Sequence, residues 1–317
     1  MTMRIVVACE ALDAAIAAYE GLGFRLDMIM PADSPRLAQM SGDGIDLRLE
    51  REGGAPALAG GEEPGNFLIT RTSADWGAGR AGMQYRDLIP SRLGGRVIAS
   101  QIRIPDGGPV NDYVHYHRVR FQMIYCRRGW VRVVYEDQGA PFAMHEGDCV
   151  LQPSGIRHRV LEASRGLEVI EVSAPAEHET IRDHDLALPT QSVRPERIFE
   201  GQRFVRRVAA EAAWTPSADG RFEIRDTGIA EATSGLAGAR VLRWAGAGGG
   251  ETAPRRHAGE LLFIAVLEGR LRLRAPSIGT QALGADDACV VPAGSDYALS
   301  ADVPCQMLEV ALPARVA

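Results

Sequence analysis

The chain has 317 residues, 46% hydrophobic and 24% charged, which is typical of a globular protein with two domains, or two plus a fragment. Its formal net charge of −6, without a basic tail, argues against nucleic acid as the main partner. All 35 basic residues are arginines. Schiff-base aldolases, pyridoxal phosphate enzymes and Walker-type phosphate loops need a lysine, so the sequence excludes them.

The sequence shows no sign of a membrane or secretory segment. No apolar run approaches the ~18 residues that cross a bilayer, and Met1 to Glu10 does not resemble a signal peptide. The five cysteines are odd in number and scattered, and four lie in apolar, strand-like segments. They are expected to be reduced thiols, which predicts a cytoplasmic protein without membrane contact.

Residues 1–52 predict a small α+β module. Residues 11–19 are apolar at helical spacing, and short β-like runs lie on both sides of them. The run "AAIAAYEGLGFRLDMI" resembles one βαβββ module of the vicinal-oxygen-chelate (glyoxalase-like) family. That family builds its metal site from paired modules, and only one module is visible, without a histidine near Val6–Ala8. A structural or dimerising role is therefore expected for this module.

The rest of the chain predicts two β-rich domains. Short runs of Val, Ile, Tyr and Phe alternate with Gly, Pro and Asp turns, a spacing typical of barrels and sandwiches. A similar layout recurs in both halves, which indicates an internal repeat. The predicted boundaries are a linker over 53–80, a first barrel over 81–185, a connector over 186–220 and a second barrel over 221–317.

A cluster of histidines in the first barrel predicts a metal site. His115 and His117 are two residues apart, so on a strand their side chains point to the same face. Gln122 follows on a neighbouring strand, and a turn containing Pro153 and Gly155 presents His158. Three imidazoles and an amide oxygen inside a small barrel would bind a divalent transition metal and leave positions open for water or substrate.

These residues resemble the cupin superfamily, whose motifs are G-x5-H-x-H-x3,4-E-x6-G and G-x5-P-x-G-x2-H-x3-N. The second motif matches at each spacing from Gly147 to His158, and in the first motif only the opening glycine is displaced, by one residue. Gln122 replaces the usual Glu, and Glu162 the final Asn. The resemblance implies a mainly β fold, with two cupin (jelly-roll) barrels after the α+β module, and metal ligands His115, His117, Gln122 and His158.

The change from Glu to Gln122 has two interpretations. Neutral ligands leave a divalent metal with its full +2 charge, which favours Lewis acidity and an anionic chelating substrate. The change also removes a carboxylate base, so that proton transfer falls to another group or the substrate arrives ionised. Alternatively, Gln122 marks weakened metal affinity and drifting function.

The second barrel keeps one of the four ligands. Alignment of the repeat places Arg255, His257, Leu262 and Tyr297 at the ligand positions. A single histidine cannot hold a metal, so this barrel is predicted to be a structural partner.

Other polar residues near the motif are candidates for substrate contact. Tyr113 shares strand parity with His115, and Arg120 (or Arg118) follows the ligands in a loop where it could grip a substrate carboxylate. We therefore place Gln122, Tyr113 and Arg120 in the catalytic set. His178 lies in an acidic stretch beyond the barrel and is expected to be exposed.

Three functional hypotheses remain open. The first is a dioxygenase-type cupin oxygenase that uses Fe(II), or Mn, Ni, Co or Zn, on a small oxygenated chelating substrate; its reaction type is implied by the resemblance alone. The second is an isomerase, lyase or hydrolase that uses the metal as a Lewis acid. The third is a non-catalytic small-molecule-binding protein. Because cupins commonly pair, a homodimer is expected.

Overall fold

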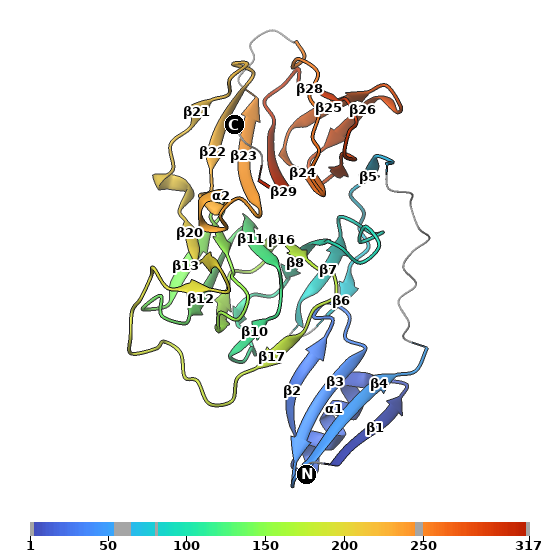
Figure 1. The fold of residues 1–317 in the computed structure, drawn as a ribbon, viewed down its shortest axis with the longest axis vertical. Helices are drawn as coiled ribbons and strands as arrows, with labels where there is room; N and C mark the ends of the chain where they lie inside the picture. The colour runs from blue at the N-terminus through green and yellow to red at the C-terminus, as the bar shows by residue number, and fades with distance from the viewer. Residues whose placement is uncertain (1–2, 54–64, 80–81, 245–249, 315–317) are drawn as a thin grey trace.

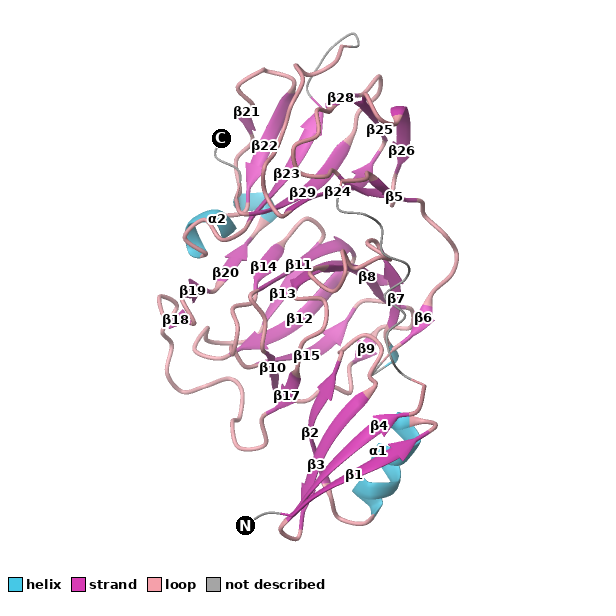
Figure 2. Ribbon diagram, turned by 45° about the vertical axis from the view of Figure 1, so that its right-hand side comes forward, coloured by secondary structure: helices cyan, strands magenta, loops and turns pink. Residues whose placement is uncertain are grey.

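The computed structural model describes residues 3–53, 65–79, 82–244 and 250–314. Three bodies follow one another along the long axis of the molecule (Figure 1). The N-terminal module lies at one end, the first barrel in the middle and the second barrel at the other end. Strands dominate, and helices are few and short (Figure 2). The prediction of a mainly β protein with two barrels is confirmed.

The N-terminal module has the predicted βαβββ order. It consists of β1 (Met3–Cys9), α1 (Leu12–Gly21), β2 (Arg25–Met30), β3 (Leu37–Gly42) and β4 (Ile45–Arg51). Its sheet has the order β1-β4-β3-β2, with β1 parallel to β4 and the other pairs antiparallel. Helix α1 packs through Leu12 on an apolar sheet face that contains Leu47 and Leu49.

The sheet of this module continues into the first barrel. Strand β2 pairs with β17 (Thr180–Arg182), and β17 pairs with β10 (His115–His117), which carries two of the predicted metal ligands. The two strands β2 and β17 lie side by side in Figure 1. The module is therefore built onto the sheet that carries the histidines.

Two sheets form the first barrel. One contains β17, β10, β15, β12 and β13, with β9 beside β15, and the other has the order β20-β14-β11-β16-β8-β7-β6. The remaining bounds are β6 (Gly77–Ala78), β7 (Gln84–Asp87), β8 (Ile98–Ile104), β9 (Gly108–Pro109), β11 (Phe121–Arg128), β12 (Trp130–Tyr135), β13 (Phe142–His145), β14 (Cys149–Leu151), β15 (His158–Ala163), β16 (Leu167–Ala174) and β20 (Val205–Arg207).

The second barrel has the same design. One sheet has the order β21-β22-β23-β29-β24-β27-β5 and the other β26-β25-β28. The bounds are β5 (Leu68–Thr70), β21 (Thr215–Pro216), β22 (Phe222–Asp226), β23 (Gly238–Trp244), β24 (Leu261–Glu268), β25 (Arg270–Ala275), β26 (Gly279–Gly284), β27 (Ala288–Val290), β28 (Ala298–Ser300) and β29 (Gln306–Leu312). A short hairpin of β18 (Ile198–Phe199) and β19 (Gln202–Arg203), the 3-10 turn Ala209–Glu211 and α2 (Ile229–Ala232) complete the fold.

The alternation of residues along each strand explains where it lies. In β25, Arg270, Arg272 and Arg274 are exposed while Leu271 and Leu273 are buried, as expected of a strand with one face in water. Strand β24 is buried on both faces. Its two faces belong to different cores, because it separates the interior of the second barrel from the first barrel.

The two barrels share an apolar core. Phe121 and Met123 of β11 and Phe263 of β24 are all fully buried in one cluster that draws on both barrels. Alternate residues of β11, among them Gln122 and Ile124, are turned to the other side and line the first barrel's cavity. The barrels are therefore packed sheet against sheet over a common core.

The segments predicted as linker and connector contain strands that cross between the barrels. Strand β5, from the predicted linker 53–80, pairs with β27 of the second barrel, while β6 from the same segment belongs to the first. Strand β20, from the predicted connector 186–220, pairs with β14 of the first barrel. The linker prediction is therefore wrong for residues 68–70 and 77–78, and residues 54–64 lie outside the described residues.

No helix in the described part of the chain is long and apolar enough to cross a membrane. All five cysteines are free thiols, as predicted, and all except Cys9 are buried.

Candidate metal centre

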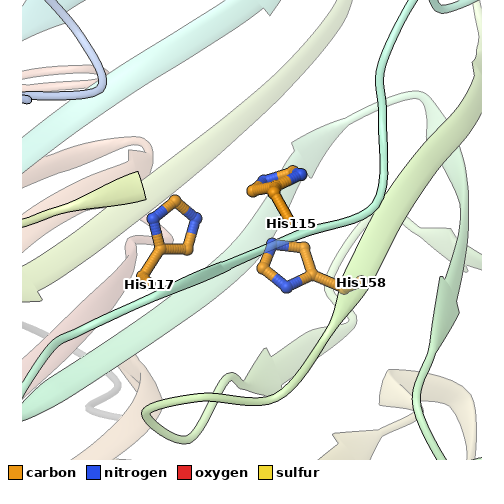
Figure 3. A group of neighbouring side chains, drawn as sticks. All are labelled: His115, His117 and His158. Carbon is orange, nitrogen blue, oxygen red and sulfur yellow. The ribbon is translucent and has the colours of Figure 1, made fainter. Parts of the chain in front are cut away.

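Three histidine rings converge inside the first barrel. His115 and His117 come from β10 and His158 from the start of β15, directly opposite His115 in the antiparallel register. Their side chains point toward one another (Figure 3), and their candidate ligand atoms all lie within 4.8 Å. The three residues are between 1% and 7% exposed. It is the one such group of His, Cys, Asp and Glu side chains found among the described residues.

A tight turn holds His158 in place. The N–H of Ile156 donates to the carbonyl of Pro153, and Gly155 at the third position of this turn has a φ of 78°. This is the left-handed region that favours glycine, which explains the P-x-G spacing of the motif. The N–H of Gly155 also donates to the carbonyl of His117, at 3.0 Å. The turn therefore couples the third histidine to the strand that bears the other two.

One nitrogen of each ring is engaged by the surrounding protein. Nδ1 of His115 lies 2.8 Å from the carbonyl of Tyr113, and Nδ1 of His158 lies 3.0 Å from that of Ile156. A carbonyl only accepts, so these Nδ1 atoms carry the proton. Nδ1 of His117 lies 3.0 Å from Thr180 Oγ1. In all three rings Nε2 is then the nitrogen that a metal would use, and the partners of Nδ1 orient the rings.

Gln122 has the orientation of a fourth ligand. Its Nε2 donates to Glu171 Oε1 at 3.0 Å, because a carboxylate accepts and cannot donate. That contact leaves Oε1 on the other side of the amide, where it is buried and accepts no hydrogen bond from the described residues. A buried acceptor without a partner is costly, and a metal ion would satisfy it. The residues present therefore fit a divalent transition metal, with three imidazoles and one amide oxygen as ligands.

Glu171 was not identified from the sequence. It lies on β16, lines the cavity, and accepts hydrogen bonds from Gln122 and from Ser173 Oγ at 2.9 Å. The Gln122 substitution therefore leaves a carboxylate beside the site. Glu171 is therefore a candidate for the group to which proton transfer was expected to fall. Its carboxylate would also offset part of the +2 charge expected for the metal.

Tyr135 and Gln152 complete the wall around His158. The ring of Tyr135 stacks on that of His158, with centroids 5.4 Å apart. Burial, and then the negative charge of Glu171, raise the pKa of Tyr135 above its ordinary value, so its phenol stays protonated. Nε2 of Gln152 lies 2.9 Å from Nε2 of His158. Gln152 therefore contacts the nitrogen assigned to the metal.

Tyr113 and Arg120 are not among the residues that line the cavity. Tyr113 precedes β10 in a loop, so strand parity does not apply to it; its ring packs against His115 and under the guanidinium of Arg182. Arg120 is turned toward the second barrel, where it forms an ion pair of 2.7 Å with Glu260. Direct catalytic roles for Tyr113 and Arg120 do not follow from these positions.

His178 contradicts the expectation of exposure. It is 5% exposed, lines the cavity and places its ring edge-on to His117 at 5.4 Å between centroids. The segment between β16 and β17 leads back to β10, with which β17 pairs. This path places His178 beside the histidines. The N-terminal module also reaches the site, since Ala32 and Asp33, which follow β2, line the same cavity.

The second barrel has the same backbone and different side chains. Arg255 bridges Tyr297 as His115 pairs with His158, and the N–H of Gly294 donates to the carbonyl of His257 as Gly155 does to His117. This confirms the alignment that placed Arg255, His257, Leu262 and Tyr297 at the ligand positions. Nε2 of His257 contacts the carbonyl of Val291 at 2.7 Å. Among the described residues of this barrel, no three His, Cys, Asp or Glu side chains converge as they do in the first barrel.

Comparison with known proteins supports the cupin superfamily. Residues 101–172 match the family model described as Cupin domain. The oxalate decarboxylase from Bacillus subtilis, solved at pH 4.6, aligns with a TM-score of 0.57 and 12% identity over 82% of this chain and 80% of that chain. A structure from work on the Mn(II) centers of the same enzyme aligns with a TM-score of 0.56 and 14% identity over 83% and 81%.

The structure of a second protein, Ylba from E. coli, aligns with a TM-score of 0.52 and 13% identity over 79% of this chain and 92% of that chain. At such identities the likeness concerns the fold, which is that of two joined jelly-roll barrels. Comparison with curated protein sequences finds no match. The resemblance of residues 1–52 to a glyoxalase-like module stays a prediction.

Proposed function

We propose that this chain is a metal-dependent cupin oxygenase of the dioxygenase type, acting on a small oxygenated chelating substrate in the first barrel. The observation that carries the proposal is the buried group His115, His117 and His158 with the amide oxygen of Gln122. Fe(II) is the first candidate metal, because imidazole and amide ligands with open positions suit it; Mn, Ni, Co and Zn are alternatives.

The metal, when bound, would supply Lewis acidity and coordination positions for substrate oxygens. The chain's own residues then have separate tasks. Thr180 and the carbonyls of Tyr113 and Ile156 fix the imidazoles. Glu171, the carboxylate that contacts Gln122, is placed to accept a proton from the bound substrate. Apolar side chains of the barrel exclude water from the reacting atoms.

A Lewis-acid lyase or isomerase is the second candidate. It is favoured by the same contact between Glu171 and Gln122, because a carboxylate beside a divalent metal is suited to proton transfer without O2. Oxygen consumption separates the two reactions. A small-molecule-binding protein without catalysis is the third candidate, and it requires only the cavity.

The test is oxygen uptake by the purified protein loaded with Fe(II), with catechol-like, β-dicarbonyl and α-hydroxy-acid substrates. Uptake that depends on substrate and is lost in the His115→Ala, His158→Ala double variant supports the oxygenase. Product formation without oxygen uptake supports the Lewis-acid reaction. No turnover with any of the five metals would contradict both enzymatic proposals.

Assembly and location remain proposals. We propose a homodimer, in the cytoplasm, with a small-molecule substrate and no nucleic-acid or membrane partner. Sedimentation of the purified chain tests the first of these.

A further inference from the structure

The cavity of the first barrel has a polar end and an apolar body. The histidines, Gln122, Gln152 and Glu171 lie in its wall together with many aliphatic side chains. Among the latter are Ile102, Ile104, Val131, Val133, Leu167 and Val169, which all belong to the barrel's own core cluster. Its volume is about 110 Å³. A dry cavity of roughly 150 Å³ is known to bind benzene, so this smaller space has room for at most one ring or a short branched chain.

The charges in the wall oppose a compact dianion. No arginine is among the residues that line the cavity in the described part of the chain. Two carboxylates line it: Glu171, which accepts hydrogen bonds from Gln122 and Ser173, and Asp33, which is ion-paired with Arg92. A divalent metal held by neutral ligands would balance Glu171 and one negative charge on a ligand, so a second negative charge on the ligand would have no cation to compensate for it. A small dianion such as oxalate is therefore a poor match for this wall, even though the fold is that of oxalate decarboxylase.

His178 supplies a hydrogen-bond acceptor at the polar end. Its Nδ1 lies 3.0 Å from the carbonyl of Pro175, so Nδ1 carries the proton and Nε2 the lone pair. Nε2 is buried and has no hydrogen-bond partner among the described residues. His178 lies outside the group of three histidines whose ligand atoms converge. Its ring is nevertheless in contact with that of His117.

We infer that the ligand of the first barrel has an apolar body, about one ring or a short branched chain, and a chelating head whose hydroxyl or amine donates a hydrogen bond to His178. The inference rests on the proposed function, for which it names the substrate class. The apolar wall selects the body, the metal ligands select the head, and His178 is a specificity-determining residue that orients the head.

The experiment is calorimetric titration of the metal-loaded protein with two α-hydroxy acids that share one chelating head, and with oxalate. Glycolate and 2-hydroxyisovalerate differ by three carbon atoms, and each buried CH2 corresponds to about fourfold in affinity. We expect 2-hydroxyisovalerate to bind at least 10-fold tighter than glycolate, by this estimate, and oxalate to bind more weakly than 2-hydroxyisovalerate. Equal or tighter binding of glycolate or oxalate would overturn the inference about the body.

Variants of His178 test the second half of the inference. His178→Leu is expected to weaken 2-hydroxyisovalerate by about fivefold, the equivalent of one hydrogen bond, and to leave its methyl ether, 2-methoxyisovalerate, unaffected. His178→Gln, which can accept a hydrogen bond, should restore part of the loss. An equal loss for the ether, or a loss of metal from His178→Leu, would contradict the assigned role.

Two further measurements distinguish failure of the proposed metal site from failure of the inference about the ligand. Metal content is determined before each titration, so a protein without metal reports on the proposed function and not on the ligand class. The metal-free protein is titrated with phenol, which has a ring and a donor but cannot chelate. Phenol binding that weakens in His178→Leu supports the inference without a metal, and no binding of phenol contradicts it.

Discussion

The two barrels of this chain have the same backbone at the ligand positions and different side chains. His115 faces His158 in the first barrel, and Arg255 bridges Tyr297 in the second. The N–H of Gln152 donates to the carbonyl of Gln122, and the N–H of Val291 donates to that of Leu262, both at 2.9 Å. The fold is therefore preserved by main-chain pairing and apolar packing, and it does not require the ligands.

The interiors of the two barrels also have equivalent backbone positions with different side-chain contacts. Glu171 of β16 and Glu309 of β29 occupy equivalent register positions, opposite Ile124 and Ile264. Glu171 contacts Gln122 and lines the cavity of the first barrel. Glu309 instead forms an ion pair of 2.7 Å with Arg240. The same scaffold therefore carries a candidate metal site in the first barrel and a structural core in the second.

The largest expected effect concerns the core that the barrels share. Phe263→Ala should lower the free energy of unfolding by about 3–5 kcal/mol, because Phe263 is fully buried between the two barrels. Its counterpart Met123 occupies the equivalent position in the first barrel, and Met123→Ala should cost about 2–5 kcal/mol. Urea unfolding followed by circular dichroism should show one transition that shifts in both variants. Two transitions, with only one shifted, would mean that the barrels fold independently.

Metal should stabilise the protein through the first barrel alone. At a free metal concentration 100 times the dissociation constant, the stabilisation is about 2.7 kcal/mol, which appears as a rise in melting temperature. His257→Ala should show the same metal-induced rise as the parent, because His257 contacts a carbonyl in the second barrel. His158→Ala should show none. A reduced rise in His257→Ala would contradict the division of roles.

A buried acidic residue of the first barrel, Asp137, lies in the turn after β12. Burial opposes ionisation of Asp137, but hydrogen bonds from Ser192, Arg197 and Arg194 outweigh it and lower its pKa to about 2. A lowered pKa contributes stability above the unfolded value of about 3.9, and this contribution is lost as the pH falls through about 2.

Asp137→Asn is therefore expected to be less stable than the parent at pH 7 by up to about 2.5 kcal/mol, since one pKa unit is about 1.4 kcal/mol. The difference between the two proteins should shrink between pH 4 and pH 2, roughly the window between the two pKa values. Chemical denaturation at several pH values measures it. A difference that stays constant down to pH 2 would exclude the charged form of Asp137 as its cause.

The smallest effect is expected at Arg120. Its ion pair with Glu260 is partly exposed, and such pairs contribute about 0–1 kcal/mol. Arg120→Ala should therefore change stability little and leave KM for an anionic substrate unaltered. A large rise in KM with kcat unchanged would restore the role predicted for Arg120 from the sequence.

The histidine positions could be predicted because the information lies within short spacings. His115 and His117 share a strand, and the Pro153–Gly155 turn fixes His158. Glu171 and His178 were missed because they reach the cavity through long-range pairing of β16 and the loop after it. A signal for Glu171 was present, since it shares strand parity with Leu167 and Val169, which face the barrel interior.

At Tyr113 and in the predicted linker, local sequence patterns predicted features that the fold does not have. Tyr113 lies outside the strand, which begins at His115, so strand alternation does not determine the direction of its side chain. Composition marked 53–80 as a linker, yet the three residues of β5 pair with β27 at a distance of more than 200 positions in the sequence. Such an exchange of short strands between barrels depends on tertiary packing and leaves little local pattern.

The central claim is that the first barrel holds one metal ion and the second holds none. Elemental analysis of the purified protein, after loading with Fe(II) and removal of excess metal, tests it directly. We expect about one equivalent in the parent and in His257→Ala, and none in the His115→Ala, His158→Ala double variant with its fold intact by circular dichroism. Metal retained by the double variant, or absent from the parent with each of the five candidate metals, would contradict the account.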